Sequence, residues 1–280
     1  MLLIYNLATR LYFTLIKVAS VLSPKAKKLY EGQQSALSQL RDYFASGSSD
    51  KPIWIHAASL GEFEQGRPVI ESIKSLRPQT KILLTFFSPS GYEVRKNYDQ
   101  ADLVTYLPFD TSENARAFID IARPQLAIFV KYEFWYHYIL VAHEARVPLV
   151  SISTIFKPSQ PFFKFYGGLH KSMLKKFDRF FVQNDQSLQL LNAIGVTNGI
   201  ISGDTRYDRV IDISAKQPGL PIIEKFIGDA PVIIVGSSWP SDLELIQSGL
   251  SKALETSKII IAPHNVDEVT VSELLDLFPG

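Results

Sequence analysis

An acidic residue, Glu62, stands where the sequence changes from a strand pattern to a helix pattern. Residues 53–58 form an apolar run with β-branched residues, which predicts a buried strand, and the small residues 59–61 interrupt it. In an open α/β sheet, ligands bind where a strand ends and the next helix begins. A carboxylate at this place can accept a proton from a bound hydroxyl, although stabilisation of its own helix is the alternative role.

Two further apolar runs end in polar side chains. After one of them, Ser88 or Ser90 could present backbone N–H groups to an anion, with plain helix capping as the alternative. After another, Lys131 and Glu133 follow directly and are flanked by aromatic residues. Exposure to solvent alone does not explain two charged residues between aromatic residues at the end of a buried strand, so the pair is a second candidate for chemistry. The alternative is a structural ion pair between the two.

A fourth polar cluster, residues 203–208, follows a short strand pattern. Arg206 could clamp a phosphate or a carboxylate through charge-assisted hydrogen bonds, whereas the alternative is helix capping by Asp204 with Arg206 in solvent. The sequence lacks the glycine patterns of a dinucleotide-binding turn and a P-loop, and it lacks a nucleophile elbow. These particular motifs are therefore excluded.

The elements that would position these residues alternate between strand and helix. Strands that are apolar throughout, joined by helical stretches, predict an α/β fold with a parallel sheet covered on both faces. We expect strands at 53–58, 82–87, 103–107, 126–130, 149–153, 180–183 and 199–202. The carboxyl ends of parallel strands share one edge, so the polar clusters could converge there.

A second domain is expected after a Pro- and Gly-containing connection at 211–230. Strands at 232–236 and 259–262 and helices at 241–253 and 266–277 make only two strand–helix units. Because two such units bury too little surface to stand alone, we expect the chain to be a shortened form of a longer protein. The expected organisation is therefore a first domain at 23–210 and the start of a second at 231–280.

The N-terminal residues 1–22 predict an amphipathic helix with one narrow polar stripe, followed by a second helix at 29–46. The stripe consists of Asn6, Thr9, Arg10, Thr14, Lys17 and Ser20. A membrane-spanning helix would place Arg10 or Lys17 in hydrocarbon at about 2.5–3.5 kcal/mol each, whereas an in-plane helix keeps both at the surface. The alternative to membrane contact is that the helix packs on the chain's own core. The basic residues at 25, 27 and 28 favour contact with an anionic membrane surface on the cytoplasmic side.

Composition excludes several kinds of site. The 280 residues have a net charge of +1, so no nucleic-acid partner is expected from overall charge. The chain has no cysteine and five scattered histidines, which excludes disulfides and thiolate metal sites and makes a zinc site unexpected. No metal or other cofactor is predicted.

Four segments closely resemble motifs of the bacterial 3-deoxy-D-manno-octulosonic acid (Kdo) transferases, which add Kdo to the lipid A precursor. The segments are HAASLGEFE at 56–64, LTFFSPSGY at 84–92, VKYEFW at 130–135 and GDTRYDR at 203–209. The first and third, at this mutual spacing, are the most specific. The likeness runs from the N-terminal helix to residues 262–264, and so covers nearly the whole chain.

This resemblance implies a GT-B glycosyltransferase of two Rossmann-like domains, the first binding the lipid acceptor and the second the donor, CMP-Kdo. Glu62 stands at the family's general-base position, where it would take the proton of a glucosamine 6-hydroxyl in an inverting transfer. Glu133 and Arg206 stand at positions of transition-state stabilisation, and Pro263 and His264 match the start of the CMP-binding set. No cofactor is implied.

The resemblance also gives the membrane helix and a basic, aromatic stretch a role. Residues 162–166, with the basic residues 170, 171, 175 and 176, would meet the phosphates and acyl chains of the acceptor, and a solvated basic helix face is the alternative. Most of the family's donor domain would lie beyond Gly280, so we expect the 280-residue chain alone to show no turnover. The rival functions are a non-catalytic, membrane-attached binding module and another GT-B enzyme such as a sugar-nucleotide epimerase.

Overall fold

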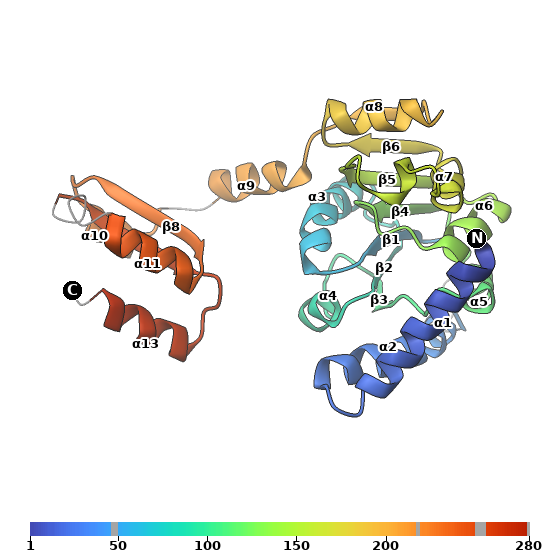
Figure 1. The fold of residues 1–280 in the computed structure, drawn as a ribbon, viewed down its shortest axis with the longest axis horizontal. Helices are drawn as coiled ribbons and strands as arrows, with labels where there is room; N and C mark the ends of the chain where they lie inside the picture. The colour runs from blue at the N-terminus through green and yellow to red at the C-terminus, as the bar shows by residue number, and fades with distance from the viewer. Residues whose placement is uncertain (46–49, 217–218, 250–255, 279–280) are drawn as a thin grey trace. The chain divides into compact units, whose positions relative to one another are not determined.

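The computed structural model describes residues 1–45, 50–216, 219–249 and 256–278. The chain divides into two compact units, Met1–Ala215 and Lys216–Gly280. The first unit is built on a seven-stranded sheet in which all neighbouring strands are parallel, in the order β3-β2-β1-β4-β5-β6-β7 (Figure 1). The strands are β1 (Ile53–Ala57), β2 (Ile82–Phe86), β3 (Leu103–Tyr106), β4 (Leu126–Val130), β5 (Leu149–Thr154), β6 (Arg179–Val182) and β7 (Gly199–Ile201).

The predicted α/β fold with a parallel sheet is confirmed, and the strands differ from their expected bounds by only one or two residues. The chain order reverses between β1 and β4, which lie side by side at the centre of the sheet. In doubly wound sheets, ligands bind at the carboxyl end of such a reversal. Glu62 follows β1, and Lys131 and Glu133 follow β4, so the fold brings these sequence-distant residues to one edge.

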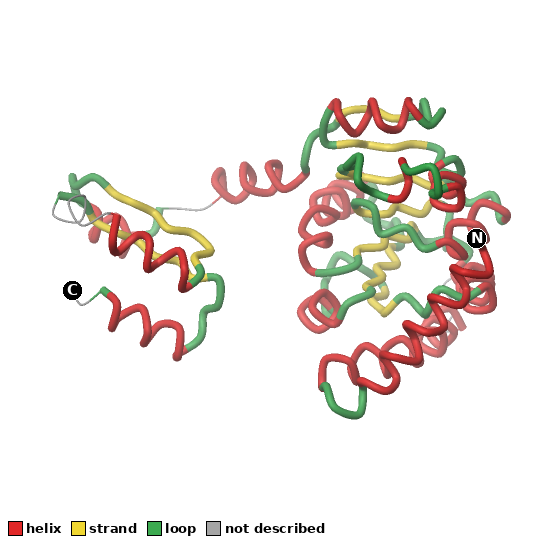
Figure 2. Tube along the Cα trace, in the orientation of Figure 1, coloured by secondary structure: helices red, strands yellow, loops and turns green. Residues whose placement is uncertain are grey.

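Helices cover both faces of the sheet, as Figure 2 shows. Successive residues of β1 belong to different cores: Trp54 packs with the cluster of α5 and α6, and Ile55 with the cluster of α3. Burial of both faces explains why the strands are apolar throughout. The helices of this part are α3 (Leu60–Leu76), α4 (Pro89–Arg95), α5 (Ser112–Ala122), α6 (Tyr136–Glu144), the 3₁₀ turn η1 (Pro161–Phe163), α7 (Gly168–Leu174), α8 (Asp185–Ala193) and α9 (Thr205–Lys216).

Two helices precede the sheet, α1 (Leu2–Ala19) and α2 (Pro24–Ala45). The second begins five residues earlier than the expected 29, because proline is favoured in a first helical turn and the Ser23 hydroxyl accepts a hydrogen bond from Ala26 N at 3.4 Å. Helix α1 is long and apolar enough, by length and composition, to cross a membrane, and little of it is buried. Its outward leucines include Leu3, Leu7, Leu11 and Leu15.

The second unit contains a two-stranded parallel sheet of β8 (Val232–Ser238) and β9 (Lys258–Pro263). Its helices are α10 (Pro221–Ile227), α11 (Pro240–Gly249) and α13 (Glu268–Leu277). The two predicted strand–helix units are therefore present, although residues 250–253 of the predicted helix lie outside the described residues. The expected connection at 211–230 contains the end of α9 and all of α10.

Candidate active site

Glu62 lies in the first turn of α3, immediately after the end of β1. Lys131 Nζ lies 3.0 Å from Glu62 Oε1, and the Ser59 hydroxyl donates a hydrogen bond to Oε2. Ser59 is the N-cap residue of α3, but its side chain binds this carboxylate instead of a backbone N–H of the helix. The Glu62 side chain is 16% exposed, so its carboxylate is half-buried yet still reached by solvent.

Lys131 is held in a backbone conformation that few side chains adopt. Its φ is 62°, in the left-handed region, which costs about 1–3 kcal/mol for a non-glycine residue. The hydroxyls of Ser151 and Thr154 donate hydrogen bonds to the Lys131 carbonyl at 2.9 and 3.1 Å, where the register of β5 shifts. These bonds fix the turn after β4, and the lysine side chain pairs with Glu62, in place of the Lys131–Glu133 ion pair weighed from the sequence.

The two carboxylates have pKa values shifted in opposite directions. Burial raises the pKa of Glu133, the negative charge of Glu62 raises it further, and Lys131 only partly offsets both. Burial also raises the pKa of Glu62, but the hydrogen bond from Ser59 and the ion pair with Lys131 outweigh burial and hold it below its usual value. Two nearby acids with separated pKa values are the usual arrangement for dividing roles in acid–base chemistry.

A buried chain of hydrogen bonds supports the segment that carries Glu133. Trp135 Nε1 donates to His56 Nε2 at 3.2 Å, so the His56 proton lies on Nδ1, which faces Thr85 Oγ1 at 3.0 Å. Trp54 Nε1 donates to the same hydroxyl at 2.8 Å. Burial lowers the pKa of His56 to about 3, so the imidazole is neutral. Its Nε2 can therefore accept the hydrogen bond from Trp135.

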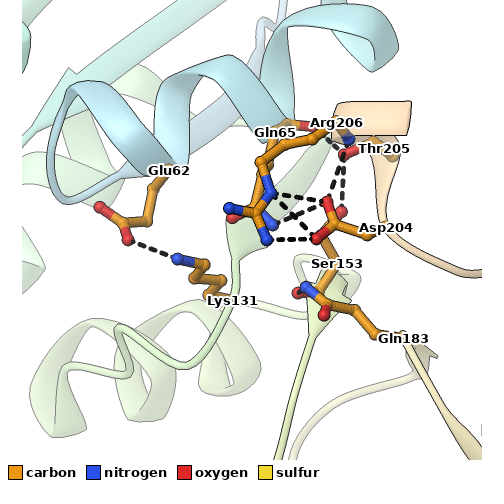
Figure 3. A network of polar contacts seen from close by, with 8 residues as sticks. All are labelled: Glu62, Gln65, Lys131, Ser153, Gln183, Asp204, Thr205 and Arg206. Atoms are coloured by element: carbon orange, nitrogen blue, oxygen red, sulfur yellow. Dashed lines mark hydrogen bonds and ion pairs between the residues drawn. The ribbon is translucent and has the colours of Figure 1, made fainter. Parts of the chain in front are cut away.

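The start of α9, which carries Arg206, is hydrogen-bonded to α3 (Figure 3). Gln65 Nε2 donates to Asp204 Oδ1 at 3.0 Å, and the Thr205 hydroxyl donates to the Gln65 carbonyl at 2.5 Å. Arg206 Nη2 lies 2.6 Å from Asp204 Oδ2, and the Arg206 side chain is 60% exposed. Burial opposes ionisation of Asp204, but the bonds from Arg206 and Gln65 lower its pKa to about 2.

Three predicted site residues come together at this edge of the first unit. The charge of Glu62 perturbs the pKa of Glu133 and that of Arg206, and Figure 3 shows the guanidinium on the side of Asp204 that faces the Glu62–Lys131 pair. Asp204 accepts a hydrogen bond from Arg206 N at 3.0 Å and pairs with the largely exposed Arg206 side chain, which is the capping alternative weighed for this cluster. An anion bound at Arg206 would compete with the Asp204 carboxylate.

The other two predicted residues, Pro263 and His264, lie in the second unit, where β9 ends. The Trp239 ring stacks on His264 with centroids 4.3 Å apart, and Ser237 Oγ lies 3.0 Å from His264 Nδ1. Ser237 lies near the end of β8, where the strand register shifts, and its φ of 56° is in the left-handed region. A flat aromatic surface beside an imidazole is suited to stacking a base.

One residue of the site was missed from the sequence, and one pairing was not foreseen. Gln65 was not singled out, although it holds Asp204. Lys131 was a candidate, but its partner is Glu62 and not Glu133. The spacing Ser59-x-x-Glu62 matches a capping box, which predicts side chain-to-backbone bonds between these residues, whereas in the structure the two side chains bond each other. The partner of Lys131 lies 69 residues away and left no local signal. Ser88 caps α4, as weighed, by accepting from Ser90 N at 3.3 Å.

The aromatic stretch expected to meet an acceptor is only partly at the surface. Phe162 is buried and Phe163 packs against the core, so these two are not available to a ligand, contrary to the expectation. Phe162 packs against the rings of Phe134 and Phe156, and Phe163 packs against Phe156. Phe165 is 99% exposed and Tyr166 is 52% exposed, with Lys164 beside them. Within the described residues, no group of three or more His, Asp or Glu side chains could hold a metal ion.

Comparisons with known proteins agree on one family. The family model described as 3-deoxy-D-manno-octulosonic-acid transferase matches residues 31–209. A 3-deoxy-D-manno-octulosonic acid transferase of Aquifex aeolicus is 25% identical over 225 residues, 79% of this chain and 57% of the relative. One of Rickettsia felis is 24% identical over 254 residues, 85% and 54% of the two chains. The chain thus spans little more than half the length of these relatives.

Solved structures with a similar fold are sugar-nucleotide epimerases. A putative UDP-N-acetylglucosamine 2-epimerase of Listeria monocytogenes has a TM-score of 0.58 at 13% identity and covers 83% of this chain and 67% of its own. The UDP-GlcNAc 2-epimerase of Neisseria meningitidis has a TM-score of 0.58 at 15% identity, covering 81% and 69%. At such identities the likeness establishes the GT-B type of fold alone.

Proposed function

The chain belongs to the 3-deoxy-D-manno-octulosonic-acid (Kdo) transferase family, and we propose that its first unit binds the acceptor and supplies the base for a Kdo transfer. The donor would be CMP-Kdo, and the acceptor the 6-hydroxyl of a glucosamine in a lipid A precursor. The observation that carries this proposal is the pair of carboxylates, Glu62 and Glu133, at the topological switch point with their pKa values shifted apart.

In the proposed step, the acceptor oxygen attacks the anomeric carbon of Kdo while the bond from that carbon to the phosphate oxygen of CMP breaks. CMP leaves with the electron pair of that bond, Glu62 takes the hydroxyl proton, and the single displacement inverts the configuration. A pKa below the usual value suits this role, because Glu62 is ionised before the acceptor binds. The acceptor hydroxyl becomes acidic only as its new bond forms, so a weak base is sufficient.

Glu133 and Arg206 are proposed to stabilise charge. Positive charge develops on the Kdo ring as CMP departs, and a nearby carboxylate such as Glu133 favours it. Arg206 would leave Asp204 to meet an anionic group of the donor, because a guanidinium binds carboxylates and phosphates with similar geometry. Pro263 and His264 would contact CMP, with the Trp239–His264 stack as part of that surface.

Membrane contact through α1 is the second part of the proposal. Leu3 and Leu7 of α1 are 84% and 70% exposed, whereas its inner face is tied to the domain through Tyr5 and Asn6. Tyr5 donates a hydrogen bond to Asp110, and Asn6 Oδ1 lies 2.8 Å from His137 Nε2. A helix with its apolar face outward suits an anionic lipid surface, and the proposed location is the cytoplasmic face of the bacterial inner membrane.

The test is Glu62→Gln in a protein of the relatives' full length that carries this sequence. The measurements are transfer of labelled Kdo from CMP-Kdo to the lipid acceptor and, separately, acceptor binding. Loss of a general base lowers kcat by about 10²- to 10⁴-fold and leaves acceptor affinity unchanged. Glu144→Gln, at an exposed position on α6, is the matched control. An unchanged kcat in Glu62→Gln would remove Glu62 as the base.

A further inference from the structure

A cavity of about 280 Å³, which neither Glu62 nor Glu133 lines, lies between α1, α2 and the segment that leads into α5. A second hollow of about 140 Å³ shares Thr9, Arg10, Asp110, Thr111 and Glu113 with it. The two hollows form one recess under the N-terminal helix. The lining of the larger hollow is mixed, because Phe13, Leu37 and Phe109 contribute apolar surface beside the polar side chains.

Gln33 lines this recess from α2 and is only 3% exposed. Neither its amide nitrogen nor its amide oxygen has a hydrogen-bond partner in the described chain. Each buried polar group left without a partner costs about 1–3 kcal/mol. Ala36 and Leu40, on the same inner face of α2, are apolar, so packing alone favours an apolar residue at 33. Gln33 is therefore suited to an occupant that both accepts and donates hydrogen bonds.

The free charges that line the recess have opposite signs. Arg10 and Glu113 take part in no ion pair within the described residues. Asp110 is already engaged, because Tyr5 OH and the backbone N–H groups of His137 and Tyr138 donate to its carboxylate. Glu113 lies in the first turn of α5, an eleven-residue helix capped by Thr111, so the partial positive charge of the helix start partly offsets the Glu113 carboxylate. The recess thus offers one place for an anion and another for a cation.

We propose that this recess binds a phosphoethanolamine group, with its phosphate at Arg10 and its ammonium at Glu113. Gln33 would donate its amide N–H to the phosphate and accept an ammonium N–H. Such a group occurs as a phospholipid head group and as a soluble phosphodiester. The head-group source rests on the membrane contact proposed above, because Arg10 lies on α1 next to the outward Leu7 and Leu11.

The experiment titrates the chain with water-soluble probes, followed by NMR, and needs neither the donor nor turnover. Glycerophosphoethanolamine is expected to bind saturably and at least tenfold more tightly than glycerophosphocholine, which has the same charges but no ammonium N–H. Inorganic phosphate is the anion control. Equal affinity for all three, or no saturable binding of any, overturns the proposal. Failure of the transferase assay leaves this measurement unaffected.

Gln33→Met separates a ligand role from a structural one. Removal of two unpartnered polar atoms should raise the thermal midpoint, while affinity for glycerophosphoethanolamine falls at least tenfold. Gln186→Met, at an exposed position on α8, should change neither. If Gln33 served packing or water alone, Gln33→Met would leave affinity unchanged, and the assignment would fall. Glu113→Gln should remove the preference for the ethanolamine probe over the choline probe; a preserved preference would overturn the placement of the ammonium.

Vesicles distinguish the two sources of the group. With a phosphatidylcholine background, added phosphatidylethanolamine should tighten vesicle binding of the chain but not of Gln33→Met, which supports the head group. Soluble probe binding without this lipid dependence supports the soluble phosphodiester. Loss of vesicle binding together with intact probe binding would overturn the membrane contact of α1 while the recess keeps its ligand.

Discussion

Lys131 and Glu62 form an ion pair across the central strands of the sheet, with Lys131 Nζ 3.0 Å from Glu62 Oε1. The pair joins the turn after β4 to the first turn of α3. Together with the hydrogen bond from Ser59, it outweighs the burial of the carboxylate and holds the pKa of Glu62 below its usual value. Lys131 therefore acts on the reaction through the ionisation of the proposed base.

Replacement of Lys131 by Met should raise the pKa of Glu62. Glu62 then takes up a proton as pH falls through its new, higher pKa, so transfer by the full-length protein should decline on the acid side at a higher pH than in the wild type. Stability at neutral pH should fall by about 1–3 kcal/mol, since a half-buried charge loses its partner. The measurement is the ¹³C NMR titration of the Glu62 carboxyl carbon, with urea unfolding for stability.

Lys157→Met provides the control, because Lys157 is exposed and forms no ion pair in the described part of the chain. It should leave the Glu62 titration and the unfolding free energy unchanged. A Glu62 titration that is the same in Lys131→Met and in the wild type would contradict the assigned role of Lys131.

His56 should make stability depend on pH below neutrality. Its folded pKa of about 3 lies below the ordinary value near 6.5, so the unfolded chain binds a proton that the folded chain excludes. Stability is therefore fully present above pH 6.5 and is lost as pH falls from there towards 3, by up to about 1.4 kcal/mol per pH unit. His56→Gln cannot titrate, and its amide can still pair with Trp135 and Thr85.

The check is urea unfolding of wild type and His56→Gln between pH 7 and pH 4.5. The unfolding free energy of the variant should fall less over this range. The difference should correspond to about one proton taken up on unfolding by the wild type but not by the variant. His143→Gln, on the outer side of α6, should keep the wild-type slope. If the unfolding free energies of wild type and His56→Gln changed equally with pH, the imidazole would take up its proton in the folded state as well.

The sheet could be predicted from the sequence because its strands are buried on both faces and read as continuous apolar runs. The convergence of Glu62 with Glu133 followed from the same reasoning, since parallel strands end at one edge. The partner of Lys131 could not be predicted. Lys131 has a left-handed backbone held by hydroxyls from β5, and its side chain pairs with Glu62, 69 residues away in the sequence.

Helix α1 shows a second limit of local patterns. Its polar stripe was expected to lie at a surface. Arg10, Thr14 and Lys17 are exposed, as expected, but the partly buried Asn6 and Thr9 line the recess. Leu7 and Leu11 point outward, whereas Ile16 is buried. Periodicity gives the two faces of a helix but not which face meets the rest of the chain, because that depends on polar partners such as Asp110 and His137 that are distant in sequence.

The outward face of α1 gives the last prediction. Leu7 and Leu11 are 70% and 58% exposed, and insertion at a bilayer surface would bury both. Replacement of both by Ser should remove about 3 kcal/mol of apolar burial and lower partition into anionic vesicles on the order of 100-fold, measured by co-sedimentation.

Leu76→Ser, at an exposed leucine at the end of α3, is the control and should leave partition unchanged. Because Tyr5 and Asn6 hold the inner face, the double variant should unfold at the wild-type temperature. Equal partition of all three proteins would show that α1 does not enter the lipid surface, and its exposed leucines would then require another covering.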